Sequence, residues 1–499
     1  MLGRPLRTMT RVTFDDAAIL AELDALRAAD APTHGGRVLS YVYDSGVPQL
    51  DELAAQAVRR MQAVNGLDPT TFTSVAALER DVVAFALGIL GGGVDAAGTV
   101  TSGGTESCLL AVKTARDLWH ASGRGAGQGG PGRLVAPVTA HAAFRKAAEL
   151  FGLVFDGVPV SPETGTCDAA AIIDRLGPDV ALVVVSAPSY PFAAMDPVGA
   201  VAAACAASGI SCHVDACIGG WILPFWPDAA SLPAWDLRVP GVTSLSADLH
   251  KYGYTPKGVS VLLHATRDRQ RAQYFATTDW PGYPVVNPTL LGSKSAGALA
   301  AAWAIIRALG ADGFTELAAR AARATHVLIA AVAGIEGLRV AGRPVGPLLA
   351  VATDEQVPPK RRVDPHHWAD AARTAGWVLQ QQPGLGQADG IRLPHTTHLT
   401  VTPVTEAALD ELVPALVAAA DAVRGEPPVD AAQVLQVVPA QLPERLDSDA
   451  AGALLAGMGL GGGGALPERM APFLALVEAL PHPVVERLLV ELLARTVAP

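Results

Sequence analysis

With 499 residues, the chain is too long for one simple hydrophobic core, so we expect one large domain and one or two smaller ones. Half of the residues are apolar and 17% are charged, which excludes a disordered chain. The net charge of −11 gives no electrostatic reason to bind nucleic acid or an anionic membrane surface.

The N-terminal segment carries charges and a proline but no apolar core of signal-peptide length, and the apolar runs elsewhere are too short to cross a bilayer. The five cysteines are odd in number and show no CxxC pair. Such cysteines are typical of a reducing compartment, and structural packing is the default role for each. We therefore expect a cytoplasmic protein with no membrane span.

Apolar periodicity predicts helices at about residues 14–30, 50–64 and 74–90. From about 95 to 265, short apolar strands alternate with helices, which indicates a mainly parallel sheet buried on both faces. The expected strands are Gly98–Ser102, Arg133–Pro137, Val180–Ser186, Ser211–Asp215, Thr243–Ala247 and Val259–Leu263.

An Ala-rich helix at about 294–309 leads into a second region of α+β character, and a helical tail with a glycine run at 459–464 follows residue 430. The expected domains are an N-terminal helical segment (1–94), a large domain (95–309), a small α+β domain (310–428) and a C-terminal helical tail (429–499).

The first motif is Thr-Ser-Gly-Gly-Thr-Glu-Ser at 101–107, between a strand and a helix. The N-terminus of a helix favours a phosphate because its N–H groups are unpaired and its dipole end is positive. Gly103 and Gly104 let the backbone approach the anion, and Thr105 adds a hydroxyl donor. Capping of the helix by Ser and Thr, with Glu106 complementing the dipole, is an equal alternative for this motif alone.

Asp215 ends the second motif's apolar strand, in Ser-Cys-His-Val-Asp-Ala-Cys-Ile-Gly-Gly at 211–220. Open α/β sheets place their ligands at the carboxyl ends of such strands. A carboxylate there can pair with a protonated ring nitrogen of a cofactor and keep the ring an electron sink. A helix cap is the alternative.

Lys251 lies in a polar turn within the third motif, which runs from Ser244 to Gly258. An amine that attacks an aldehyde needs a lowered pKa, which we expect partial burial beside other cations to supply. His250 can donate to a cofactor phosphate. A lone lysine in a loop is usually a solvated charge, but this one follows two other motifs in order. In the fourth motif, His141 follows a strand and can stack on a planar cofactor, with Ala216 and Cys217 on its other face, or serve as a structural histidine.

These motifs, as an ordered set, resemble the pyridoxal-phosphate (PLP)-dependent group II decarboxylase superfamily, and within it the sphingosine-1-phosphate lyase branch. The resemblance covers residues from about 36 to 425, and Asp-Trp-Pro-Gly at 279–282 and Asn-Pro-Thr-Leu-Leu-Gly-Ser at 287–293 also carry it. It implies an α/β protein of PLP fold type I, like aspartate aminotransferase, with a mainly parallel seven-stranded sheet and a small α+β C-terminal domain. It also implies a homodimer whose active sites lie at the subunit interface.

The resemblance further implies roles for individual residues. Lys251 would carry PLP as a Schiff base, Asp215 would pair with the pyridine nitrogen, and His141 would stack on the ring. Gly103, Gly104, Thr105 and His250 would hold the phosphate, Ser186 would lie near the phenolic oxygen, and Ser293 would reach over from the other subunit. Tyr43 and Lys257 match positions that handle the substrate's phosphate.

Two departures from the branch concern the substrate pocket. Asn-Gly-Leu-Asp-Pro at 65–69 has Asp68 where the branch has a phosphate-binding histidine, and Leu150 replaces a tyrosine. An added carboxylate repels a dianion, so we expect a remodelled pocket in which Asp68 could instead meet a cationic group of the substrate.

The leading functional interpretation is retro-aldol cleavage of a β-hydroxy amine to an aldehyde and a smaller amine, with no metal. Lys251, Tyr252 or Tyr254 would take the hydroxyl proton. The alternative is amino-acid α-decarboxylation, for which Arg392 and Lys257 are candidate carboxylate partners. A PLP-binding scaffold without catalysis is the least favoured interpretation, because Lys251, Asp215 and His141 are all retained.

Overall fold

The computed structural model describes residues 15–124, 130–430, 435, 446–457, 460 and 469–498. Its centre is a seven-stranded sheet in the order β1-β7-β6-β5-β4-β2-β3. The strands are β1 (Ala97–Thr101), β2 (Arg133–Pro137), β3 (Val154–Val158), β4 (Val180–Ser186), β5 (Ser211–Asp215), β6 (Ser244–Ala247) and β7 (Ser260–His264). Strand β7 runs antiparallel to both neighbours and the other pairs are parallel. The expected mainly parallel, seven-stranded sheet is therefore confirmed.

Both faces of this sheet are covered by helices because its strands are apolar on both sides. In β4, all seven residues are buried. Leu182 and Val184 pack with α4 (Gly104–Ala121) and α5 (Ala142–Leu150), whereas Val183 and Val185 pack in the core that holds α7 (Val198–Ala207). Because successive side chains of a strand point to opposite faces, a strand that is covered on both faces needs a continuous apolar run. Helices α6 (Ala169–Ile173) and α8 (Arg267–Gln273) complete this domain.

Three N-terminal helices precede the large sheet, and one long helix connects the two domains. They are α1 (Asp16–Arg27), α2 (Pro48–Met61), α3 (Thr73–Ile89) and α9 (Gly297–Ala333). Helix α9 is kinked at Gly310, which has a φ of 54°. Among the described helices, α9 alone has the length and apolarity to cross a membrane, but half of its most apolar window is buried in the fold, as in the core helix of a soluble protein. It packs against α2 and α3.

The smaller domain contains a four-stranded antiparallel sheet in the order β10-β11-β15-β12. Its strands are β10 (Leu338–Val340), β11 (Leu348–Thr353), β12 (Gln380–Gln382) and β15 (Thr396–Thr400), with a short hairpin of β13 (Leu385–Gly386) and β14 (Arg392–Leu393). Helices α10 (Pro365–Thr374) and α11 (Thr405–Val423) share an apolar core with this sheet and the second half of α9. This α+β character agrees with the sequence analysis.

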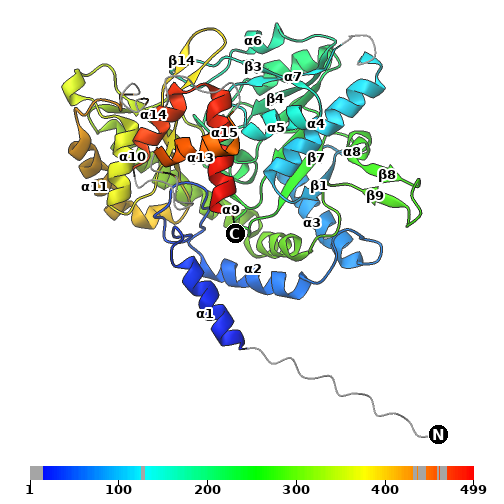
Figure 1. Cartoon of the computed structure of the whole chain (residues 1–499). Helices are drawn as coiled ribbons and strands as arrows, with labels where there is room; N and C mark the ends of the chain where they lie inside the picture. The colour runs from blue at the N-terminus through cyan, green and yellow to red at the C-terminus, as the bar shows by residue number, and fades with distance from the viewer. Residues whose placement is uncertain are drawn as a thin grey trace.

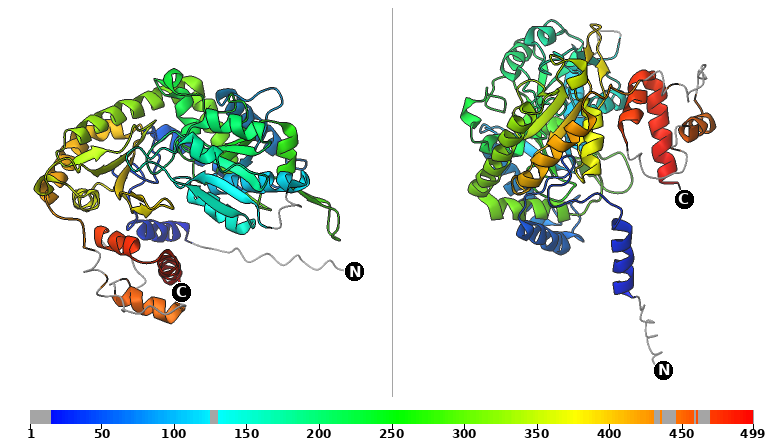
Figure 2. Two further views of the ribbon diagram at one scale, coloured as in Figure 1. Left: turned by 90° about the horizontal axis from the view of Figure 1, so that it is seen from above. Right: turned by 90° about the vertical axis from the view of Figure 1, so that its left-hand side faces the viewer.

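Two parts of the chain project from this body. The hairpin of β8 (Phe275–Thr277) and β9 (Val285–Asn287) extends at one end, and α1 stands apart from the domains (Figure 1). The tail helices α13 (Ser448–Gly457), α14 (Ala471–Ala479) and α15 (His482–Thr496) lie beside the small domain (Figure 2). The predicted domain boundaries stay predictions, and most of the glycine run at 459–464 falls outside the described residues.

Candidate functional site

The candidate site lies at the carboxyl edge of the large sheet. Ser186, Asp215 and Ser246 stand side by side in the register of β4, β5 and β6. Strand β1 runs in the same direction as β6, because both are antiparallel to β7, so its last residue, Thr101, reaches the same edge. The motifs that the sequence analysis selected therefore meet at one edge of the sheet.

Lys251 follows β6 in a turn and forms a buried ion pair. Its Nζ atom lies 3.1 Å from Oδ2 of Asp248, and 18% of its side chain is exposed. Burial is the largest single effect and lowers the pKa of Lys251. Attraction to Asp248, together with smaller contributions from Tyr43, Cys217 and Asp215, outweighs burial and raises this pKa well above its usual value. The expectation of a lowered pKa was therefore wrong, because the nearest charge to Lys251 is a carboxylate three residues away and not a cation.

Asp248 was not selected from the sequence, although it lies within the third motif. Burial alone raises its pKa, but Lys251, His250 and the Ser260 hydroxyl lower it below the usual range. Its Oδ1 atom is buried without a hydrogen-bond partner among the described residues. Its i,i+3 spacing from Lys251, just after a buried strand, is the signal that could have identified it.

The two glycines of the first motif lie against the third motif. A Cβ atom on Gly104 would be 2.4 Å from Oδ2 of Asp248, so no other residue fits at this position without displacing the carboxylate. Gly103, with a φ of 151°, adopts a backbone conformation that favours glycine and faces the ring of His250. His250 donates from Nδ1 to the carbonyl oxygen of Val259, at 2.9 Å, and burial lowers its pKa.

Both interpretations of the first motif find support at the start of α4. Glu106 accepts from the backbone N–H of Ser102 at 2.6 Å and of Leu290 at 2.7 Å, so it acts as a structural cap. Thr105, by contrast, is exposed in the first turn of the helix. The N-terminal N–H groups of this helix and the Thr105 hydroxyl thus form a site that suits an anion.

Asp215 and Ser186 occupy the ends of adjacent strands, and both are buried. Asp215 accepts from the backbone N–H of Cys217 through Oδ1 at 3.1 Å. The backbone N–H of Ser186 donates to Oδ2 of Asp196, whose pKa burial raises to about 7. His141 caps α5, its Nδ1 accepting from the backbone N–H of Ala143 at 3.2 Å, and its ring is exposed. The proton of neutral His141 is therefore on Nε2.

Tyr43 and Lys257, predicted to handle the substrate, lie together. The Nζ atom of Lys257 is 4.8 Å from the centre of the Tyr43 ring and donates to the carbonyl oxygens of Tyr41, at 3.0 Å, and His250, at 3.3 Å. Burial, together with repulsion from Lys251, lowers the pKa of Lys257. Burial raises the pKa of Tyr43 to about 12, while nearby Lys251 opposes this rise.

The two tyrosines proposed as bases pack into the protein. Tyr252 is fully buried and donates its hydroxyl to the carbonyl oxygen of Val401 at 2.9 Å. Tyr254 lies parallel to Phe314, with ring centres 6.4 Å apart, and burial raises its pKa. These contacts give both phenols a structural role at the junction of the two domains.

Three other predicted residues have their contacts elsewhere. Asp68 accepts hydrogen bonds from the N–H and hydroxyl groups of Thr70 and Thr71, which lower its pKa, and this turn holds both of its oxygens. Ser293 is exposed and accepts from Asn65 at 3.3 Å. Arg392 pairs with Glu478 of α14. Over the described residues, none of these contacts involves Lys251 or its neighbours.

Tyr190 and His398 were also missed by the sequence analysis. Their rings stack with centres 4.0 Å apart, and the Tyr190 hydroxyl is buried without a hydrogen-bond partner among the described residues. Tyr43 and Lys251 are close enough to Tyr190 to influence its pKa, which burial raises. Nothing in the sequence alone indicates this contact, because it joins the loop after β4 to a strand of the small domain.

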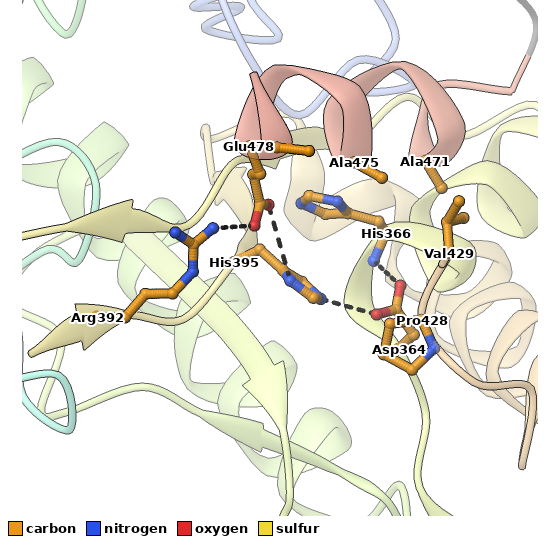
Figure 3. A pocket seen from close by; sticks show the side chains of 10 residues that line it. Asp364, His366, Arg392, His395, Pro428, Val429, Ala471, Ala475 and Glu478 are labelled. Carbon is orange, nitrogen blue, oxygen red and sulfur yellow. Dashed lines mark hydrogen bonds and ion pairs between the residues drawn. The ribbon is translucent and has the colours of Figure 1, made fainter. Parts of the chain in front are cut away.

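A polar cavity of about 230 Å³ lies between the small domain and α14 (Figure 3). In it His395 donates from Nε2 to Oδ2 of Asp364 at 2.7 Å, and its Nδ1 lies 3.8 Å from Glu478. Glu478 also binds Arg392 and accepts from the backbone N–H of Gly384 at 2.9 Å. The charged groups that line this cavity are thus paired with one another.

A strand-edge lysine, a carboxylate on the neighbouring strand and a glycine cradle at a helix N-terminus define the class of PLP-dependent enzymes of fold type I. These residues fit PLP: the cradle suits its phosphate, Asp215 suits its pyridine nitrogen, and Lys251 suits its aldehyde. The family described as "Pyridoxal-dependent decarboxylase conserved domain" matches residues 80–341. The chain belongs to this family, and PLP is its cofactor. A second family, "Pyridoxal-dependent enzyme, C-terminal putative HTH domain", matches residues 397–495.

Several relatives of this chain are sphingosine-1-phosphate lyases. The lyase of Dictyostelium discoideum is 34% identical over 337 residues, which cover 67% of this chain and 63% of that protein. The lyase of rice is 32% identical over 417 residues, covering 82% and 73%. A solved lyase structure from Burkholderia pseudomallei has a TM-score of 0.74 and 33% identity, covering 84% of this chain and 93% of the other. Glutamate decarboxylase of Lactobacillus brevis, at 16% identity and a TM-score of 0.73, shares the fold.

Proposed function

We propose that this chain is a PLP-dependent carbon–carbon lyase that cleaves a β-hydroxy amine into an aldehyde and a smaller amine. The buried Lys251–Asp248 pair beside the glycine cradle is the observation that carries the proposal. The names of the relatives support a lyase over a decarboxylase. The chain spans 63% and 61% of the lengths of the Dictyostelium and rat relatives, so the activity is a proposal for this chain.

Each residue of the site has a proposed task in holding the cofactor. Lys251 binds it covalently, Asp215 pairs with its pyridine nitrogen, and His141 stacks on its ring. Ser186 lies near the phenolic oxygen. The phosphate lies at the N-terminus of α4, held by Gly103, Gly104, Thr105 and His250, where unpaired N–H groups and the helix dipole favour an anion.

When bound, PLP supplies an electron sink for the bond that breaks. The Nζ atom of Lys251 is the proposed base for the β-hydroxyl proton of the substrate. Asp248, 3.1 Å away, stabilises the ammonium that results. We assign this role to Lys251 because the Tyr252 hydroxyl already donates to Val401 and Tyr254 packs against Phe314.

The substrate is proposed to lie beside Tyr43 and Lys257, whose aromatic ring and ammonium lie 4.8 Å apart. Asp68 accepts from the hydroxyls of Thr70 and Thr71 in its own turn, so a cationic group of the substrate would compete with these donors. The decarboxylase alternative loses one of its two cationic candidates, because Arg392 is bound to Glu478.

We further propose a cytoplasmic homodimer in which the hairpin of β8 and β9 and the following segment contact the partner subunit. Its exposed apolar side chains support such an interface. They are Phe275, Trp280, Tyr283 and Val286. Ser293 follows this hairpin, is exposed, and is the residue proposed to reach the partner's cofactor.

The test is a spectral titration of the full chain with PLP, followed by a phosphorylated long-chain base and its dephosphorylated form. We expect near-visible absorbance when Lys251 binds PLP, and aldehyde release from at least one of the two bases. Lys251→Ala should abolish both signals. Lys113→Ala is the matched control, because Lys113 is also a partly buried lysine. Its ammonium, however, donates to the carbonyl oxygens of Ala272 and Gln273.

Each outcome decides between named functions. Aldehyde from the phosphorylated base alone would assign a phosphosubstrate lyase, and aldehyde from the dephosphorylated base would assign a lyase with a remodelled pocket. Carbon dioxide from an amino-acid panel, with no aldehyde from either base, would overturn the lyase in favour of the decarboxylase. No change in absorbance with any amine would leave only a PLP-binding scaffold.

A further inference from the structure

Two cysteines lie close to Asp215, on the elements that frame the cofactor site. Cys108 is in the first turns of α4, and Cys217 is two residues beyond the end of β5. One ligand atom from each of Cys108, Cys217 and Asp215 lies within 4.8 Å of the others, and all three residues are buried. Neither cysteine has a role in the proposed reaction.

The local hydrogen bonds hold these groups in place. The Cys217 thiol donates to Oγ of Ser246 at 3.3 Å, and its backbone N–H donates to Oδ1 of Asp215. A hydrogen bond with Cys108, burial and nearby carboxylates raise the pKa of Cys217. When a metal ion binds to the sulfur of a thiol, the thiol proton is released to solvent.

The buried carboxylates around these thiols favour a bound cation. Asp215 and Asp248 are both buried, and Lys251 is the ammonium that Asp248 holds. Buried carboxylates are stable only when paired or bound to a metal. With both thiols neutral, these groups carry a charge of −1 from Asp215, and a divalent ion bound by two thiolates and this carboxylate also leaves −1. Metal binding therefore leaves the net charge unchanged but places a cation directly beside the buried carboxylate, where the low dielectric constant strengthens their attraction.

From this cluster we infer a second site in this chain: Cys108, Cys217 and Asp215 bind a thiophilic divalent cation of the zinc class in the cofactor-free protein, and this cation excludes PLP. The inference rests on the proposed function at one point, the assignment of Asp215 to the pyridine nitrogen. One carboxylate cannot serve both a metal and a pyridinium, and the two cations also repel each other. The PLP-bound and metal-bound forms are thus alternatives.

The donor set determines the class of cation. Two sulfurs and one carboxylate oxygen suit zinc or cadmium, whereas magnesium and calcium prefer oxygen ligands alone. Three protein ligands leave the fourth tetrahedral position of zinc for water. The other close pair, Cys205 and Cys212, has no acidic residue in a comparable cluster among the described residues, so it provides an internal control.

The test uses Co²⁺ as a spectroscopic probe on the reduced full chain, freed of metal and PLP. We expect near-ultraviolet thiolate-to-cobalt absorbance that saturates at one Co²⁺ per chain and is displaced by Zn²⁺. Cys108→Ser should abolish it while leaving PLP binding intact, and Cys205→Ser should leave it unchanged. Cys108→Ala repeats the test with a different side chain, and circular dichroism checks that each variant is folded.

Loading the protein with PLP beforehand should prevent the cobalt signal, and Zn²⁺ should slow the appearance of the lysine-bound cofactor absorbance. No saturable signal in the wild-type chain, or an equal signal in Cys108→Ser, would overturn the metal site. A signal that depends on Cys108 but persists in PLP-loaded protein would overturn the exclusion and the pyridine role of Asp215. Failure of PLP to bind to metal-free protein would count against the proposed function alone.

Discussion

The site at Lys251 can be compared with the cluster of Asp364, His395 and Glu478 between the small domain and α14, here called the junction. Both combine carboxylates, histidines and a cation, but they differ in how completely those groups are paired. At the junction, Asp364 accepts from the N–H groups of His366 and His367 and from the His395 ring. At the Lys251 site, Oδ1 of Asp248 and the hydroxyl of Tyr190 are buried without hydrogen-bond partners in the described part of the chain. Paired groups hold two surfaces together, whereas unpaired ones are available to a ligand.

It follows from this difference that a polar cavity is not by itself a functional site. The charged groups that line the cavity of Figure 3 pair with one another, and Glu478 of α14 binds Arg392 and Gly384 of the small domain. Two oxygens of Asp370 accept from the N–H groups of Met470 and Ala471 and cap the same helix. We interpret the junction as the attachment of the tail and the Lys251 site as the place of chemistry.

Among the variants that test this comparison, replacement of Lys251 should have the largest effect on activity. Lys251→Ala removes the only amine that the proposal assigns to the aldehyde of PLP, so turnover should fall by at least ~10³-fold. Steady-state aldehyde release measures this change. An equal loss in Arg392→Ala, which acts at the junction, would contradict the division into a chemical site and an attachment site.

Gly104→Ala should have the next largest effect. The new Cβ atom would lie 2.4 Å from Oδ2 of Asp248, and the carboxylate or the start of α4 must then move. We expect PLP to bind about 10- to 100-fold more weakly, which corresponds to about 1.4–2.8 kcal/mol. Fluorescence titration with PLP measures this affinity. Gly199→Ala in α7 is the matched control, because nothing lies within 4 Å of its added Cβ atom.

The fold was more predictable than the site because its signals are local. The run Val-Ala-Leu-Val-Val-Val-Ser gave β4 with the correct ends, 180–186. Strand β3 was missed because Val-Phe-Asp-Gly-Val at 154–158 contains Asp156 and Gly157 and is only partly buried at the edge of the sheet. Asp248 was missed because its pairing with Lys251 depends on how the turn after β6 folds. The cluster of Asp364, His395 and Glu478 joins residues far apart in sequence.

Tyr190→Phe should have an effect of intermediate size, and it should lower activity while leaving stability nearly unchanged. Among the described residues the Tyr190 hydroxyl has no partner with hydrogen-bond geometry, although Thr400 is close enough to lower its pKa. Its loss should therefore change the free energy of unfolding by less than about 0.5 kcal/mol. We expect kcat/KM to fall about 10-fold if this hydroxyl contacts the substrate, a loss of about 1.4 kcal/mol in transition-state binding. Urea unfolding and steady-state kinetics measure the two effects.

Tyr252→Phe is the matched control for this prediction. Its hydroxyl donates to Val401, so its removal leaves a buried carbonyl oxygen without that donor. This variant should lose about 1 kcal/mol or more of stability. If Tyr190→Phe proves equally destabilising, Tyr190 has a structural partner and its hydroxyl does not belong to the substrate site.

The smallest effect is expected at the junction, where pH should control the attachment of α14. Burial alone lowers the pKa of His395, but Asp364 and Glu478 outweigh burial and raise it. A histidine with a raised folded-state pKa contributes its full stability below the unfolded value of about 6.5, and this contribution is lost as the pH rises through the folded value. His366, whose pKa burial and His395 lower, and Arg392, which is always charged, are the other cationic groups at this contact.

Hydrogen exchange of the α14 amides, corrected for intrinsic rates, should therefore show less protection at pH 8 than at pH 6. His395→Gln should remove most of this dependence and lower protection at pH 6 by about 1.5–3 kcal/mol, the contribution of a hydrogen bond to a charged group. His366 titrates in the opposite sense at lower pH, because its lowered pKa favours the neutral ring. PLP affinity should not change in His395→Gln. A parallel change would mean that the junction and the Lys251 site are coupled and that the tail regulates the chemistry.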